Sequence, residues 1–150
     1  MTQSGTPLVL HATCVAWEGR AVLIRGASGA GKSALGLELM AWGCGLVADD
    51  RTELWAREGR LMARCPVAIR GLIEARGVGI LRAEAVEEAE VVVVADLGEV
   101  EGERLPPWRS VTLLNVTLPL LRKPLNGTFG GPILQFLKAG RAEPAPPRTP

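Results

Sequence analysis

A glycine-rich octapeptide between an apolar run and a helical stretch is the feature that most constrains this chain. Residues 21–24 are apolar and predict a buried strand, and residues 34–42 carry apolar side chains at helical spacing. The segment that joins them follows the pattern G-x-x-x-x-G-K-[ST] and reads Gly26-Ala27-Ser28-Gly29-Ala30-Gly31-Lys32-Ser33. Between a strand and a helix, this pattern is typical of a loop whose backbone N–H groups surround phosphate at a helix N-terminus. The sequence therefore predicts an α/β fold with a phosphate loop (P-loop) that binds a nucleotide.

The last two residues of the octapeptide carry the chemistry. Lys32 can reach the outer phosphates of a nucleotide, and the Ser33 hydroxyl suits Mg²⁺, a hard cation that prefers oxygen ligands. The alternative is an ordinary glycine-rich turn between a strand and a helix.

Length and composition predict one compact domain. The chain has 150 residues, of which 47% are hydrophobic, so it can bury a sizeable core. The net charge of +1 gives no basic surplus for nucleic acid or an anionic membrane. No apolar run approaches the ~18 residues of a membrane span, and the N-terminus lacks the pattern of a signal peptide. We expect a domain over residues 1–142 and a disordered tail over 143–150, which holds four prolines.

Three cysteines without a C-x-x-C pair favour reduced, mostly buried thiols and a cytoplasmic location, and they make a zinc site improbable. They are Cys14, Cys44 and Cys65.

The pattern of apolar residues predicts the main elements. Expected strands are 8–10, 13–17, 21–25, 46–48, 91–97 and 111–118, with a hairpin over 52–55 and 61–64. The helix after the glycine loop has Leu35, Leu39 and Trp42 on one face, which predicts a stripe that packs on the core. Residues 98–108 are expected to form an exposed, mobile loop, and 132–137 a short helix.

Acidic residues after the strand 46–48 are the next candidates. Asp49 and Asp50 should emerge beside the glycine loop, so that one carboxylate faces a phosphate acceptor while the other braces the loop. The alternative is a solvated pair that ends a strand. His11, the only histidine, is by itself more often structural than catalytic. Glu74 and Arg76 lie among glycines, which suggests a loop near a ligand, although an exposed turn explains them almost as well.

Four motifs in order give the chain a family resemblance. His11 is followed by the octapeptide, by Val-Ala-Asp-Asp at 47–50, and by Glu-Ala-Arg-Gly-Val-Gly-Ile at 74–80. In this order and spacing, residues 11–80 resemble the catalytic domain of the bacterial HPr kinase/phosphorylase family. The resemblance implies a P-loop domain related to phosphoenolpyruvate carboxykinase.

The resemblance also implies roles for individual residues. The octapeptide would hold ATP, with Lys32 on the phosphates, and Ser33 and Glu74 would be the Mg²⁺ ligands. Asp50 would be the base that takes the proton from an acceptor serine, and His11 would lie close enough to tune it. Arg76 would belong to the segment that supports the transfer.

The implied acceptor is a serine of HPr, the phosphocarrier of the sugar phosphotransferase system, or of its nitrogen-related counterpart, and family members resemble hexamers. The chain departs from the family pattern in several ways. It resembles a short form without the separate N-terminal domain, and a family segment is missing between Arg82 and Val91. Arg104 is the candidate for a catalytic arginine of a mobile loop, and residues 122–127 only weakly match a segment linked to dephosphorylation.

We therefore expect an ATP-dependent serine kinase with weak or absent phosphorylase activity. Two alternatives stay open. One is a small-molecule P-loop kinase, and the other is a non-catalytic module that binds ATP and signals through a partner.

Overall fold

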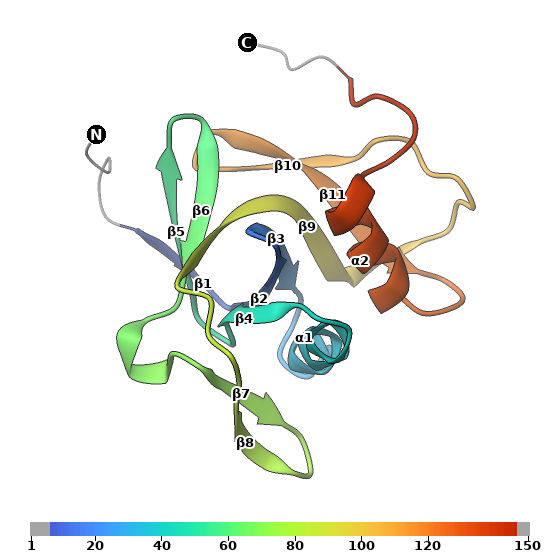
Figure 1. Cartoon of the computed structure of the whole chain (residues 1–150). Helices are drawn as coiled ribbons and strands as arrows, with labels where there is room; N and C mark the ends of the chain where they lie inside the picture. Colours follow the sequence, from blue (N-terminus) through green and yellow to red (C-terminus); the bar gives the residue numbers. More distant parts are fainter. Residues whose placement is uncertain (1–6, 147–150) are drawn as a thin grey trace.

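A curled mixed sheet with two helices on one face forms the body of the protein (Figure 1). The structure, a computed structural model, describes residues 7–146. The sheet consists of β1 (Leu8–Leu10), β2 (Ala12–Trp17), β3 (Arg20–Arg25), β4 (Gly45–Ala48), β5 (Thr52–Arg57), β6 (Arg60–Arg64), β9 (Glu88–Glu101), β10 (Ser110–Leu113) and β11 (Val116–Pro124). The remaining elements are α1 (Lys32–Ala41), α2 (Gly130–Ala139), the 3₁₀ turn η1 (Val67–Ile69) and a separate hairpin of β7 (Leu72–Ala75) and β8 (Gly79–Arg82).

The long strand β9 organises the sheet. The strand order of the sheet is β1-β5-β6-β9-β3-β2-β4, and β9 pairs in parallel with β3 along one edge. On its other edge, the first part of β9 pairs antiparallel with β6 and the later part pairs in parallel with β11. A β-branched run of four valines, residues 91–94, supplies the strand propensity and is buried or half-buried throughout. The predicted central strand is thus confirmed.

A register shift in β9 redirects its side chains. Ala21 pairs with Val91 and Val22 with Val93, so that Val92 is an extra residue opposite β3. Val91 therefore packs on one face of the sheet, whereas Val93 packs on the face covered by the helices. The bulge therefore determines on which face of the sheet the side chain of each later residue of β9 lies, including that of Asp96.

Helix α1 lies close against β2 at Gly36. A Cβ atom at Gly36 would stand 2.9 Å from the Thr13 Cγ2 atom, so the glycine permits a contact that a larger residue obstructs. Leu39 is fully buried in the core between the helices and the sheet, together with Ile133 and Leu137 of α2. Both helices therefore cover the same face, and α1 is held where its N-terminus meets the strand ends.

Three expectations about local structure were wrong. Residues 98–101 continue β9, because β11 pairs with Val100 and Glu101 after a register shift, so the loop is shorter than predicted. Residues 111–118 form two strands, since Leu114 and Asn115 both adopt the left-handed conformation that a two-residue hairpin turn needs. Trp42 lies beyond the end of α1 and is 47% exposed, so it does not continue the stripe on the core.

The three cysteines are buried and free, as predicted. No helix within residues 7–146 is long and apolar enough to cross a membrane. The expected disordered tail over 143–150 falls partly outside the described residues, and it stays a prediction.

Candidate functional site

A cavity of about 460 Å³ gathers most of the side chains that the sequence singled out. We call it the glycine-loop cavity. It lies where the octapeptide, the start of α1, the end of β4 and the β7–β8 hairpin meet. Its lining includes His11, Lys32, Ser33, Asp50, Glu74 and Arg76. Residues that are up to 65 positions apart in the chain, from 11 to 76, therefore share one site.

The octapeptide wraps around the ammonium group of its own lysine. Gly29 (φ 83°) and Gly31 (φ 104°) adopt left-handed conformations that side chains disfavour. Lys32 Nζ donates hydrogen bonds to the carbonyl oxygens of Gly26 (2.9 Å) and Ala27 (3.1 Å), and Lys32 is only 8% exposed. A buried cation thus lies beside the N-terminus of α1, whose first N–H groups lack partners within the helix. Positive charge and free donors together favour an anion here.

Asp49 joins three elements beneath the cavity. Its Oδ1 atom accepts hydrogen bonds from Ser33 Oγ (2.6 Å) and Thr13 Oγ1 (2.8 Å). Its Oδ2 atom accepts one from the Glu74 backbone N–H (3.0 Å). Asp49 is buried, and a buried carboxylate needs such donors to offset its lost hydration. It therefore fixes α1, β2 and β7 relative to one another.

Thr13 was missed by sequence reasoning. It is fully buried in β2 on the face that meets α1. The one available signal was a hydroxyl residue inside an otherwise apolar strand.

Asp50 turns the opposite way from its neighbour. It lies in the bend after β4 with φ 69°, and its side chain is 61% exposed. His11 Nδ1 lies 3.1 Å from Asp50 Oδ1, and the His11 side chain is 72% exposed. One aspartate thus braces the loop while the other lines the cavity, and the left-handed backbone at Asp50, just beyond the end of β4, separates the two side chains.

Glu74 and Arg76 come from the β7–β8 hairpin. Both are exposed on the side of the hairpin that lines the cavity, and Ser33 lines the same cavity. No cluster of three His, Cys, Asp or Glu side chains suited to a metal ion occurs in residues 7–146. The hydroxyl of Ser33 and the carboxylate of Glu74 are nevertheless hard oxygen donors of the kind that Mg²⁺ takes together with phosphate oxygens.

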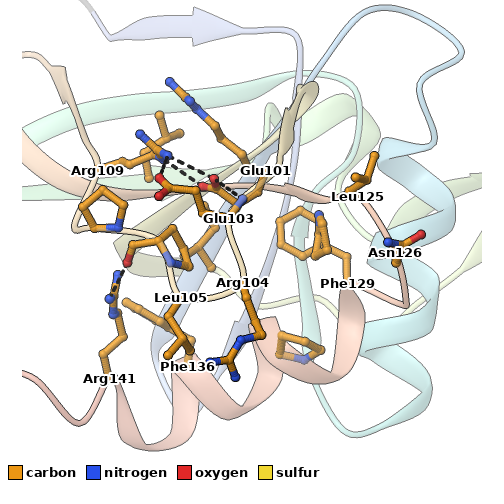
Figure 2. A pocket seen from close by; sticks show the side chains of 18 of the residues that line it. Glu101, Glu103, Arg104, Leu105, Arg109, Leu125, Asn126, Phe129, Phe136 and Arg141 are labelled. Atoms are coloured by element: carbon orange, nitrogen blue, oxygen red, sulfur yellow. Dashed lines mark hydrogen bonds and ion pairs between the residues drawn. The ribbon is translucent and has the colours of Figure 1, made fainter.

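Arg104 is not brought to this cavity. It lies in the loop between β9 and β10 and lines a second cavity of about 910 Å³ (Figure 2). Its assignment as a catalytic arginine stays a prediction.

An ion pair at the start of the octapeptide was not expected. Asp96 Oδ2 accepts a hydrogen bond from Arg25 Nε (3.0 Å), and Asp96 Oδ1 accepts one from the Gly98 N–H (2.7 Å). Asp96, within β9, is the register partner of Arg25, the last residue of the parallel strand β3. The pair therefore anchors the chain directly before the glycine loop begins at Gly26.

Comparison with known proteins agrees with this architecture and site. The family described as HPr Serine kinase C-terminal domain matches residues 4–94, which is more than half of the chain. The HPr kinase/phosphorylase of Leptothrix cholodnii is 48% identical over 69 residues, and that of Limosilactobacillus reuteri is 47% identical over 73 residues. These alignments cover 45% and 48% of this chain but only 21% and 23% of the relatives.

A solved structure extends the likeness beyond that segment. The structure of the Hpr(Ser) kinase/phosphatase from Coxiella burnetii superposes with a TM-score of 0.71 at 26% sequence identity. The match covers 87% of this chain and 88% of the Coxiella chain. Fold and site thus define a domain of the HPr kinase class. The chain belongs to the HPr serine kinase C-terminal domain family.

Proposed function

We propose that this protein is an ATP-dependent serine kinase that phosphorylates an HPr-like phosphocarrier protein. The observation that carries the proposal is the lining of the glycine-loop cavity. It combines the buried Lys32, two oxygen groups that could bind a metal ion (Ser33 and Glu74), and the exposed pair of Asp50 and His11. Phosphoryl transfer depends mainly on positioning and on neutralising charge, and these groups supply both.

The residues around the octapeptide fit a nucleotide with its magnesium ion. The loop of residues 26–33 and the N-terminus of α1 would hold the phosphates of ATP, and Lys32 would exchange its loop carbonyl partners for phosphate oxygens. Ser33 and Glu74 would be the protein ligands of Mg²⁺. Bound Mg²⁺ neutralises phosphate charge during transfer. Asp49 would keep the Ser33 hydroxyl oriented through its 2.6 Å hydrogen bond.

Asp50 would act as the base. Its carboxylate takes the proton of the acceptor serine while the serine oxygen bonds to the γ-phosphorus of ATP. The bond from that phosphorus to the β–γ bridging oxygen breaks, which leaves ADP and phosphoserine. His11, 3.1 Å from Asp50, would orient the carboxylate. The exposure of both side chains supports an acceptor that arrives from solvent.

The acceptor and the reverse reaction rest on family resemblance. The relatives are HPr kinase/phosphorylases, and they are much longer than the matched segments. We infer weak or absent phosphorylase activity, because residues 122–127 match the dephosphorylation segment poorly. A cytoplasmic homo-oligomer, a hexamer by resemblance, is part of the same proposal.

The test is transfer of labelled γ-phosphate from Mg-ATP to purified HPr. Asp50→Asn should lower serine labelling by about 10²- to 10⁴-fold while ATP binding is retained. Glu58→Gln is the matched control, since Glu58 is also an exposed acid in a left-handed turn, and it should label normally. ATP binding without labelling of HPr by the native chain would instead favour a metabolite acceptor or a non-catalytic ATP sensor.

A further inference from the structure

A second cavity, larger than the glycine-loop cavity, lies away from the octapeptide and shares no lining residue with the glycine-loop cavity. We call it the α2 cavity. Its walls are the loop between β9 and β10, the strand β11 with the turn after it, the start and middle of α2, and the chain that follows α2 (Figure 2). At about 910 Å³, it lies within the range of pockets that hold small molecules.

The lining of the α2 cavity is mostly apolar. Phe129 is buried, Phe136 is half-buried, and Leu121 of β11 adds an aliphatic wall. Two large apolar side chains stand exposed in the lining, with Leu105 at 76% and Leu125 at 66%. Exposed leucines around an apolar hollow are costly in water, so their burial against an apolar ligand would be favourable.

The charged side chains of the lining are mostly paired with each other. Arg109 donates to both carboxylate oxygens of Glu101, at 2.7 and 3.0 Å, and also contacts Glu103 (Figure 2). These bonds lower the pKa of Glu101, which agrees with an ion pair that is satisfied at neutral pH. Arg141 pairs with Glu143.

The last two arginines of the lining differ from each other. Arg122 Nε lies 3.1 Å from a carboxylate oxygen of Glu99. Arg104 forms no ion pair within residues 7–146. Figure 2 shows its side chain extending from the loop toward α2 and away from the Arg109 cluster. One cation therefore remains available beside the apolar lining.

We propose that the α2 cavity binds a small molecule with an apolar, aromatic or aliphatic body and one anionic group such as a carboxylate. The apolar body lies on Phe136, Leu121 and the exposed leucines, and the anion pairs with Arg104. A single charge is specified because the other arginines of the lining already face carboxylates. The concave shape and volume favour a small molecule over a protein partner.

The probes are a pair of dyes that differ by one charge. 1-Anilinonaphthalene-8-sulfonate is an aromatic monoanion, and N-phenyl-1-naphthylamine has the same rings without the sulfonate. Fluorescence titration of the native chain should give saturable binding of the anion at one site per chain, about tenfold tighter than the neutral dye. Octanoate should displace the anionic dye, whereas octanol should displace it less well.

Two exposed-residue variants locate the site. Arg104→Gln should weaken binding of the anionic dye about tenfold and leave binding of the neutral dye unchanged. Arg60→Gln is its control, since Arg60 is an exposed residue at the start of β6 outside the cavity. Leu105→Glu should weaken binding of the anionic dye at least as much. Val67→Glu is its control, since Val67 is 80% exposed and lies outside the cavity.

Saturable binding that responds to Arg104→Gln and Leu105→Glu, and to neither control, supports the proposal. It is overturned if no saturable binding occurs, if both dyes bind equally, or if a control variant has the same effect as its partner. It is also overturned if the native chain self-associates in sedimentation and Leu105→Glu abolishes the association, because a second copy would then cover the cavity.

Discussion

Replacing Gly36 by alanine should have two opposite effects on stability, a gain in helix propensity and a loss from overpacking against β2. In the interior of a helix, alanine is more favourable than glycine by about 1 kcal/mol. At Gly36, however, the added Cβ would stand 2.9 Å from Thr13 Cγ2, and overpacking of this kind costs about 1–3 kcal/mol. The cost of the clash should exceed the gain in helix propensity, so we expect Gly36→Ala to lower the free energy of unfolding by about 1 kcal/mol.

Two further variants isolate that clash. Gly131→Ala lies in α2 with nothing within 4 Å of the added Cβ, so it should stabilise the protein by up to about 1 kcal/mol. Thr13→Ser removes the obstructing methyl group but keeps the hydroxyl that donates to Asp49. In that background, Gly36→Ala should become neutral or stabilising, which amounts to a coupling of about 1–2 kcal/mol between the two positions.

Urea unfolding, followed by tryptophan fluorescence and by circular dichroism, measures these differences, and equal m-values confirm that only stability has changed. The reasoning is refuted if Gly36→Ala stabilises the chain as Gly131→Ala does, or if its effect is the same with Ser and Thr at position 13. Calorimetry with ADP adds a functional readout, since a shift of α1 on β2 should also weaken the proposed nucleotide binding.

Three other changes have expected outcomes. The bonds from Arg109 lower the pKa of Glu101 below its ordinary value of 4.5, so that this pair stabilises the protein above about pH 4.5. Glu101→Gln should therefore be destabilising at pH 7, and its difference from the native chain in urea unfolding should shrink as the pH falls below 4.5. Burial raises the pKa of the Cys14 thiol, so at pH 8 iodoacetamide should modify Cys14 only in urea, as detected by mass spectrometry. Asp49→Asn leaves one acceptor oxygen where the carboxylate has two that together accept three hydrogen bonds, and we expect a loss of about 1–2 kcal/mol in unfolding free energy and weaker ADP binding by calorimetry.

The parts of the site that are local in sequence could be predicted. The octapeptide specifies a strand, a turn and a helix start within a dozen residues, and the structure has each of them in place. Asp50 and His11 were grouped through the order of the family motifs, and they lie 3.1 Å apart. The octapeptide carries its geometry with it because its backbone conformation and hydrogen bonding are set by near neighbours, whereas the pairing of His11 with Asp50 across 39 positions came only from the family resemblance.

The parts that depend on distant pairing could not be predicted. Arg25 and Asp96 are 71 positions apart, and nothing in either segment specifies the other. The bulge at Val92 interrupts the two-residue alternation of side chains along the strand. Because the run of valines is uniform, the sequence does not reveal the bulge, and the face of the sheet on which Asp96 lies could not be predicted. Residues 98–101 resemble a polar loop in sequence, and they extend β9 because Val100 and Glu101 pair with the end of β11.

The central position of β9 has a consequence for biosynthesis. β3 carries the glycine loop and is made early, but its parallel neighbour emerges only after residue 88. Until then β3 and β6 each present an unpaired edge, and exposed edges of apolar strands invite pairing with other chains. Fragments that stop before β9 should therefore aggregate although they contain the whole octapeptide, and the nascent chain must complete β9 before the candidate nucleotide site can form.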